Sequence, residues 1–211
     1  MVFMDSRFEG KFAGKESIED ALKRLNERLV YAEIEPLSLV ICGGASLNIM
    51  GYVSRSTSDV DILAVVTKGL GQQIELMSGE ALPWKFDELV EEVGRELGLA
   101  GDWLNFGPEP LLKFGLPAGL KDRMKEIKYG DCLTIHAISR WDQIHLKCHA
   151  ALDPGSRIET HLGDLLELEP TEEEAKASVN WLLDRPAGEE FRERVKQLME
   201  RIGHEELAKT I

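Results

Sequence analysis

The sequence predicts an α/β (α+β) protein in which a mixed β-sheet is flanked by helices and followed by a helical C-terminal region. Short apolar runs typical of strands alternate with helical periodicity up to about residue 139, and every patterned segment after that is helical. Of the 211 residues, 43% are apolar and 30% are charged, so the chain can bury a substantial core. We therefore expect a core at residues 1–139, with an N-terminal helix and a mixed sheet, and a helical region at residues 140–211 packed on it.

The first half of the chain alternates between helix and strand. Residues 1–16 have mixed composition and are predicted to form an arm, and Ser17 and Asp20 are a weak capping pair for the first helix. The predicted elements are then a helix to about Tyr31, a strand at 37–42, a helix at 45–50, a strand at 59–66, a long connection at 69–83 and a helix at 86–97 ended by Gly98.

The second half contains two further predicted strands and becomes entirely helical from residue 140. The predicted elements are a short strand at 103–106, a loop at 108–117, a helix at 120–127, a strand at 132–138, and helices at 141–151 and 157–168. Thr171 and Glu174 have the spacing of a capping box before another helix. Pro186 is expected to separate that helix from a last one containing Phe191 and Ile202.

The stretch from Leu39 to Val66 carries the chemistry. Gly43 and Gly44 follow the first strand, where a backbone without Cβ atoms can turn sharply and approach a ligand. The helix predicted after them starts with unbonded N–H groups, which form a natural phosphate site. Asp59 and Asp61 are two residues apart, so their carboxylates leave one face of a strand and repel unless a cation joins them. The pattern predicts a Mg²⁺ and triphosphate site.

These residues resemble the signature of the nucleotidyltransferase superfamily, which is a Gly-Gly or Gly-Ser turn, a short helix, and Asp-x-Asp or Asp-x-Glu on the next strand. The run Arg55-x-Thr57-x-Asp59-x-Asp61 is similar, more narrowly, to the bacterial and archaeal branch containing the AbiEii-type toxins of abortive-infection and toxin-antitoxin systems. The resemblance implies a nucleotidyltransferase-fold sheet in this part of the chain.

A second block lies in the C-terminal region. Lys147, Arg157 and Asp164 resemble the second motif of the same branch, a helix Lys followed by an Arg and an Asp. The two blocks together extend from about Ser38 to Asp164. On the residues alone, Lys147 is more commonly a helix lysine that reaches solvent, and Asp164 is equally a surface acid.

The resemblance implies a cofactor and a reaction. Asp59 and Asp61 would hold one or two Mg²⁺ (or Mn²⁺) ions, while an acceptor hydroxyl attacks the α-phosphorus of a nucleoside triphosphate and pyrophosphate leaves. The acceptor would be a protein, an RNA end or a small molecule, and an antitoxin is a further expected partner. The residues expected to hold or neutralise the phosphates are Gly43, Gly44, Ser46, Arg55, Thr57 and Lys147, with Asp164 completing the catalytic set.

Two features depart from the family pattern. Gly44 stands where a Ser would offer a hydroxyl to the triphosphate, although Ser46 follows closely. Many active members also use a third carboxylate, for which Asn105 and the flanking Asp102, or Asp131 before a later strand, are insecure matches. We consider Asp102 and Asp131 as candidate bases for the acceptor hydroxyl.

Two other classes of function remain open. A catalytically inactive nucleotidyltransferase-fold protein that acts through a protein partner would explain the missing third carboxylate. A phosphate-binding or hydrolytic metal protein outside this superfamily would also use Asp59 and Asp61, but the strand-helix-strand context favours it less. The intact pair of aspartates favours the enzyme.

Composition limits the classes of partner and the cellular compartment that we expect for this chain. The net charge of -13 and the pI near 4.9 argue against an extended nucleic-acid-binding surface. No apolar run is long enough to span a bilayer, and the N-terminus does not have the pattern of a secretory signal. The 3 cysteines have no Cys-x-x-Cys spacing, which favours the cytoplasm over an oxidising compartment. His145 and His149 share a helix face, yet their spacing does not match a zinc protease motif.

Overall fold

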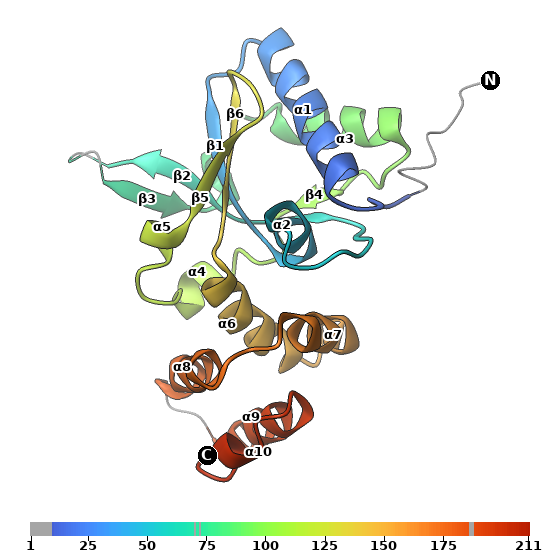
Figure 1. Cartoon of the computed structure of the whole chain (residues 1–211). Helices are drawn as coiled ribbons and strands as arrows, with labels where there is room; N and C mark the ends of the chain where they lie inside the picture. The colour runs from blue at the N-terminus through green and yellow to red at the C-terminus, as the bar shows by residue number, and fades with distance from the viewer. Residues whose placement is uncertain (1–9, 70, 72, 186–187) are drawn as a thin grey trace. The chain divides into compact units, whose positions relative to one another are not determined.

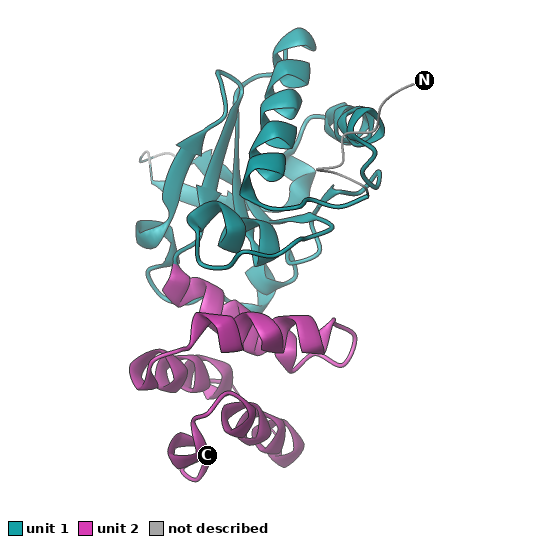
Figure 2. Ribbon diagram, turned by 45° about the vertical axis from the view of Figure 1, so that its right-hand side comes forward, with its two compact units in different colours: residues 1–139 teal, residues 140–211 magenta. Residues whose placement is uncertain are grey.

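The computed structural model describes residues 10–69, 71, 73–185 and 188–211, and within them it has the predicted mixed α/β architecture (Figure 1). The strands are β1 (Leu37–Cys42), β2 (Val60–Lys68), β3 (Ile74–Met77), β4 (Leu104–Asn105), β5 (Lys125–Lys128) and β6 (Leu133–Ala137). The helices are α1 (Lys15–Tyr31), α2 (Gly43–Met50), the 3-10 turn η1 (Gly79–Ala81), α3 (Phe86–Leu97), α4 (Leu111–Phe114), α5 (Leu120–Arg123), α6 (Arg140–Ala151), α7 (Ile158–Leu168), α8 (Glu172–Leu183), α9 (Glu189–Arg201) and α10 (Glu205–Ala208). The chain forms two compact units, residues 1–139 and 140–211 (Figure 2).

The sheet of the N-terminal unit is mixed. Its strand order is β3-β2-β1-β6-β5, with β4 beside β2. β1 runs antiparallel to β2 and parallel to β6, and β4 runs parallel to β2. Parallel neighbours cannot be joined by a tight hairpin, so the chain crosses over between β1 and β6, and α3 lies in that crossing segment.

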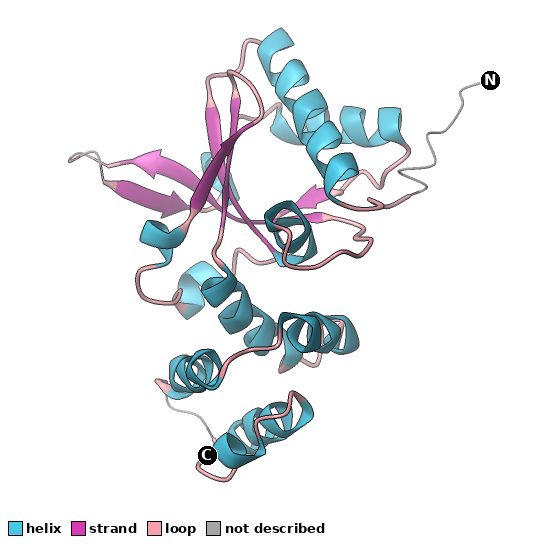
Figure 3. Ribbon diagram, viewed as in Figure 1, coloured by secondary structure: helices cyan, strands magenta, loops and turns pink. Residues whose placement is uncertain are grey.

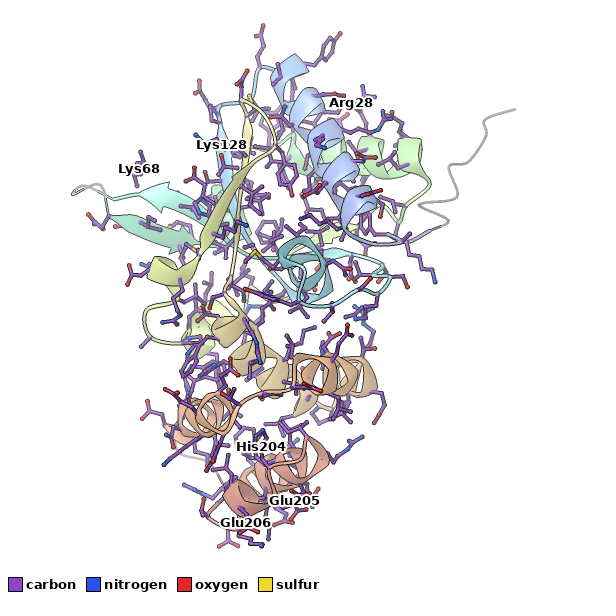
Figure 4. The ribbon with its side chains drawn as sticks, in the orientation of Figure 1. Arg28, Lys68, Lys128, His204, Glu205 and Glu206 are labelled. Atoms are coloured by element: carbon purple, nitrogen blue, oxygen red, sulfur yellow. The ribbon has the colours of Figure 1, made fainter. Side chains whose placement is uncertain are left out.

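Helices α1 and α3 lie on the same side of the sheet (Figure 3). The helical repeat predicted for α1 is confirmed, because Ile18, Leu22, Leu25 and Leu29 are completely buried. On the exposed surface, Arg24 and Arg28 of α1 both donate to the carboxylate of Glu96 in α3, with 2.9 Å between Arg28 Nη2 and Glu96 Oε2. Arg28 is labelled in Figure 4. Exposed ion pairs contribute little to stability, so most of the stabilisation of α1 against α3 comes from the apolar core.

The predicted connection at 69–83 is wrong in one respect, because it contains β3 and η1. β3 is an edge strand with no buried residue, so its sequence has no alternation of apolar and polar positions to reveal it. Lys121 of α5 donates from Nζ to the carbonyl oxygen of Ile74 at 2.8 Å. That bond covers one polar group of a strand edge that would otherwise invite pairing with another chain.

Two predictions between residues 108 and 127 are also corrected. The expected loop at 108–117 contains the one-turn helix α4, and the expected helix at 120–127 stops at Arg123. Residues 125–128 instead form β5, which pairs antiparallel with β6. The sequence Lys-Glu-Ile-Lys suits a helix by propensity, but cross-strand pairing with β6 decides its conformation.

The first helix begins earlier than its predicted cap. Gly14 is the N-cap residue and Ser17 lies at the third helical position, where its Oγ donates to the Gly14 carbonyl oxygen at 2.7 Å. Residues 1–9 of the predicted arm lie outside the described residues. The described end of that segment is anchored, because Phe12 is fully buried and forms a β-bridge with Thr57.

The C-terminal unit is helical, as predicted. The capping box before α8 is confirmed, because Thr171 Oγ1 accepts from the Glu174 amide at 3.2 Å and Glu174 Oε2 accepts from the Thr171 amide at 2.9 Å. His204, before α10, contacts the Pro170 carbonyl oxygen through Nε2 at 2.9 Å (Figure 4). The predicted break at Pro186 lies outside the described residues. None of the helices in the described part of the chain has the length and apolar character that a membrane span requires.

Candidate functional site

The glycine turn after β1 fits closely around a carboxylate. Gly43 has a φ of 69°, in the left-handed region, and a Cβ added there would lie 2.2 Å from Oδ2 of Asp61. A side chain at this position would therefore meet both backbone strain and the carboxylate. α2 begins here without a side-chain cap on its first amides. The turn places the start of a helix against one aspartate, as the sequence predicts.

Asp61 lies where three strands meet. It pairs with Cys42 of β1 on one side and with Asn105 of β4 on the other. Val60 and Ile62, its neighbours in β2, are completely buried, whereas Asp61 is half-buried. At the start of β2, Asp61 therefore lies on the face opposite Val60 and Ile62. Further along the strand there is no apolar-polar alternation, because Leu63, Ala64 and Val65 are all buried.

Asp59 ends the loop that leads into β2 and is half-buried. Its two carboxylate oxygens accept from different hydroxyls, Oδ1 from Thr57 Oγ1 at 3.4 Å and Oδ2 from Ser58 Oγ at 3.1 Å. Short hydroxyl side chains therefore hold Asp59 at the edge of the site without burying its charge.

Arg55 and Thr57 lie against the second glycine of the turn. A Cβ added to Gly44 would be 2.9 Å from Arg55 Nη2 and 2.9 Å from Thr57 Oγ1. Arg55 also donates through Nη1 to the Ser56 carbonyl oxygen at 3.0 Å. The glycine thus allows a guanidinium and a hydroxyl to approach the beginning of α2, where positive charge and donors suit an anion.

A chain of buried contacts fixes the loop that carries Arg55 and Asp59. Phe12 and Thr57 exchange backbone bonds of 2.7 and 3.1 Å, and the Phe12 ring meets Trp103 edge-on with centroids 5.8 Å apart. Trp103 in turn donates from Nε1 to the Val90 carbonyl oxygen at 2.8 Å, and its own carbonyl oxygen accepts from the Val60 amide at 2.6 Å. Sequence reasoning missed Phe12, because a single aromatic in a mixed segment has no periodicity.

Asn105 occupies the strand position beside Asp61. Its Oδ1 accepts from the Gly107 amide at 2.9 Å, and a Cβ on Gly107 would lie 3.0 Å from that oxygen and 4.0 Å from Asp61 Oδ1. Asp102 precedes β4 and accepts from Asn105 Nδ2 through its backbone carbonyl oxygen at 3.4 Å. The side chain next to Asp61 on β4 is therefore an amide, which cannot act as a base at neutral pH.

Asp131 does not belong to this site. It lies in the turn before β6, whose first residue, Leu133, pairs with Leu37 at the start of β1. Asp61 pairs with Cys42 at the opposite end of β1. Five residues of extended strand separate the two levels, roughly 17 Å, so Asp131 is too far away to take a proton there.

Ser46 is completely buried in α2, and its Oγ has no hydrogen-bond partner among the described residues. Asn48 in the same helix donates from Nδ2 to the Gly44 carbonyl oxygen at 2.9 Å. The Ser46 hydroxyl therefore faces the interior of the unit, whereas Gly43 and Gly44 border the half-buried aspartate. The glycine amides are better placed than Ser46 to meet a phosphate.

Lys147 and Asp164 are brought together, within the C-terminal unit. Lys147 Nζ lies 2.6 Å from Asp164 Oδ2 and 3.4 Å from His161 Nδ1, and the exposed fractions of the two charged side chains are 6% and 1%. Neither the solvent-reaching lysine nor the surface acid considered from the sequence is correct. The pair joins α6 to α7, and Arg157 is the N-cap residue of α7.

The histidines of α6 contribute to packing. His145 donates from Nδ1 to the Trp141 carbonyl oxygen at 2.7 Å, and its ring centroid is 5.8 Å from that of Trp181. Burial lowers the pKa of His149, whose ring is 6.1 Å from Trp181. Burial also raises the pKa of the Cys148 thiol to about 12, which keeps it protonated and unreactive. No group of three or more His, Cys, Asp and Glu side chains suited to a metal occurs among the described residues.

Searches with family models, against curated proteins and against solved structures, found no match to this chain.

Proposed function

We propose that the chain is a Mg²⁺-dependent (or Mn²⁺-dependent) nucleotidyltransferase that moves a nucleoside monophosphate from a triphosphate to an acceptor hydroxyl. One observation carries the proposal. The carboxylate of Asp61 lies against Gly43 at the beginning of α2, so that a methyl group there would be 2.2 Å from Oδ2, and the Arg55 guanidinium lies against the next glycine. A carboxylate, a cation and unbonded helix amides thus converge on one turn.

The donor set suits magnesium. Asp59 and Asp61 are half-buried oxygen donors, and Asp61 lies against Gly43. Mg²⁺ typically takes one or two carboxylates and completes its octahedron with waters and substrate phosphates, so two aspartates are sufficient. When bound, the ion would polarise the α-phosphate and offset charge on the leaving pyrophosphate.

The chain's own residues would act as follows. The first amides of α2 would donate to the phosphates, and Arg55 would neutralise one of them with its planar fork. Asp59 and Asp61 would orient the acceptor hydroxyl, whose oxygen bonds to the α-phosphorus as the bond to the β-phosphate oxygen breaks. Because Asn105 cannot accept the hydroxyl proton, that proton would pass to one of the two aspartates or to water.

Lys147 and Asp164 enter the proposal as a positioning pair. The Lys147 ammonium is neutralised by Asp164 at 2.6 Å, so direct contact with a triphosphate would require this ion pair to open. We propose that the pair holds α7 to α6 and shapes the C-terminal unit. Substituting either residue should lower the stability of the C-terminal unit and have a smaller effect on affinity for nucleotide.

Calorimetric titration with each nucleoside triphosphate plus Mg²⁺ tests the proposal. The wild-type chain should bind one of them only when the metal is present, and the Asp59→Asn, Asp61→Asn double variant should lose that binding. The matched control is Asp87→Asn, Asp122→Asn, which removes two exposed carboxylates elsewhere in the same unit. No binding of any triphosphate at millimolar concentration, or equal loss in the control, would reject the site.

Asn105 favours one alternative, a catalytically inactive nucleotidyltransferase-fold protein that acts through a protein partner. In that case the chain would bind Mg²⁺ and triphosphate without transferring label from an α-phosphate-labelled nucleotide. Asn105→Asp places a carboxylate beside Asp61 and should raise Mg²⁺ affinity whether the protein is an enzyme or an inactive homologue of one.

Four further proposals rest on the sequence resemblance and the composition. The acceptor would be a protein, an RNA end or a small molecule, and an antitoxin would control the activity. The protein would act as a toxin of the AbiEii-like kind and would be located in the cytoplasm.

A further inference from the structure

β5 (Lys125–Lys128) is an outer strand of the sheet in the N-terminal unit. Among the strands that the structure describes it pairs only with β6, and three of its four residues are exposed. The side chains of Glu126 and Lys128 are 56% and 71% exposed, and Lys128 is labelled in Figure 4. The side of β5 away from β6 therefore has no neighbouring strand in the described part of the chain.

The backbone groups on that outer side belong to Glu126 and Lys128. The Tyr129 amide donates to the Leu133 carbonyl oxygen at 2.9 Å, so Tyr129 is one of the residues that bond to the β6 side. Alternate residues of an antiparallel ladder bond to the same neighbour, so Ile127 bonds to β6 as well. The amides and carbonyl oxygens of Glu126 and Lys128 therefore point away from β6.

A second copy of the chain offers a matching strand. In a symmetric dimer the two β5 strands lie antiparallel about a two-fold axis, and only residues with outward backbone groups exchange hydrogen bonds. The register centred on Ile127 places each Glu126 opposite Lys128 of the second copy. Registers centred on Glu126 or on Lys128 place like charges opposite each other, which is destabilising. The sequence Lys-Glu-Ile-Lys thus favours one register of self-pairing.

β3, at the opposite end of the strand order, does not have this property. The carbonyl oxygen of Ile74 points outward but already accepts from Lys121 Nζ at 2.8 Å. The next outward residue along the strand is Leu76, and the self-paired register that uses both places Glu75 opposite Glu75 of the second copy. Hydrogen bonding and charge therefore disfavour self-pairing at β3 and favour it at β5.

We propose that the chain forms a weak symmetric dimer in which the two β5 strands pair antiparallel, with Ile127 on the two-fold axis. Glu126 and Lys128 of the two copies would exchange backbone hydrogen bonds, and the two Ile127 side chains would meet in the non-bonded pair, where facing side chains lie closest. Lysines on an edge strand commonly prevent pairing, but here each Lys128 would face a glutamate. The proposal does not depend on the nucleotide site.

The strength of the dimer is limited by its size and by net charge. Strands of four residues alone bury less than the roughly 1,200–2,000 Å² of a standard interface. Each chain also has a net charge of -13, which opposes association at long range. At about 0.15 M salt, exposed charges more than about 8 Å apart are largely screened. We therefore expect a reversible, concentration-dependent dimer at that ionic strength.

Sedimentation equilibrium of the full chain, at about 0.15 M salt and up to about 1 mM protein, tests the pairing. The average mass of the wild type should rise from 23.6 kDa towards twice that value with concentration. Lys128→Glu and Glu126→Lys each place like charges opposite each other and should weaken association at least about tenfold. The double variant Glu126→Lys, Lys128→Glu restores opposite charges and should associate like the wild type. Lys176→Glu, at an exposed position of α8, matches the charge change of Lys128→Glu and should alter association less than about twofold.

A mixture of the two single variants gives the sharpest result. In a mixed dimer of Lys128→Glu with Glu126→Lys, every charged pair across the strands is again opposite in sign, so the mixture should associate at least about tenfold more strongly than either variant alone. A structural role of these side chains within one chain would not produce such a rescue. A wild type that stays monomeric at about 1 mM, single variants that dimerise like the wild type, or a mixture without rescue would each overturn the proposal.

Discussion

Asp61 in the N-terminal unit and the Lys147–Asp164 pair in the C-terminal unit are two ways of placing charge in one chain. Asp61 is half-buried on an otherwise buried strand and touches a turn made of glycine. Lys147 and Asp164 are 6% and 1% exposed and neutralise each other at 2.6 Å. The first arrangement leaves a carboxylate accessible to a cation from solution, and the second uses opposite charges to hold two helices. An accessible charge is therefore the better indicator of a ligand site.

The largest effect is expected from Lys147→Met. Removing the ammonium leaves the buried carboxylate of Asp164 without its partner, which should lower the free energy of unfolding by about 3–5 kcal/mol. Urea denaturation of the isolated variant measures this loss. The double variant Lys147→Met, Asp164→Leu removes both charges and should recover much of it. A loss below about 1 kcal/mol in the single variant would contradict the interpretation that Lys147 and Asp164 form a buried ion pair that stabilises the fold.

Gly43→Ala should have the next largest effect. The left-handed backbone of Gly43, with φ 69°, should cost about 1–2 kcal/mol for any residue with a Cβ, and the new methyl group would displace the Asp61 carboxylate. Gly51→Ala is the matched control, because its φ of 73° carries the same strain while nothing lies within 4 Å of the added atom. Thermal unfolding should place both variants at similar stability, and only Gly43→Ala should lose metal-dependent nucleotide binding. Equal metal-dependent nucleotide binding by both variants would contradict the proposal that close contact between Gly43 and Asp61 is needed for binding.

Asp61→Asn should have a small effect on stability and a large one on binding. The side chain is half-buried, so removing its charge should change the free energy of unfolding by less than about 1 kcal/mol, in contrast to Lys147→Met. Denaturation and titration with Mg²⁺ and nucleotide on the same preparation separate the two quantities. A destabilisation as large as that of Lys147→Met would show that Asp61 has a structural role instead.

The smallest effect is a pH dependence from His149. Burial is the main cause of its lowered pKa, with Asp153 opposing and Arg185 reinforcing the shift. Because the unfolded chain then binds the proton more readily, stability is present above about pH 6.5 and declines as the pH falls towards the lower pKa of the folded state. The free energy of unfolding of His149→Gln should change less than that of the wild type between about pH 5 and 8, the range around the ordinary histidine pKa of roughly 6.5. An unchanged pH profile would contradict a buried neutral ring.

Sequence reasoning worked where the physical signal is local. The apolar repeat of α1 and the capping box at Thr171 depend on residues within one or two turns, and both are present in the structure. It failed at β3 and β5, which contain no buried residue and whose conformation depends on pairing with β2 and β6, respectively. Where the local conformational preference of a segment is weak, its conformation is determined by the strand with which it pairs.

The sequence by itself determined the mixed α/β class, the glycine turn before a strand that begins just after Asp59 and the helical nature of residues 140–211, because periodicity and spacing encode them directly. Only the tertiary structure decided that Asn105 stands beside Asp61, that Asp131 lies at the far end of β1, that Phe12 anchors the site loop and that Lys147 is sealed against Asp164. Each of these relations joins residues distant in the chain, and such contacts arise from strand pairing and core packing, which a local pattern does not contain.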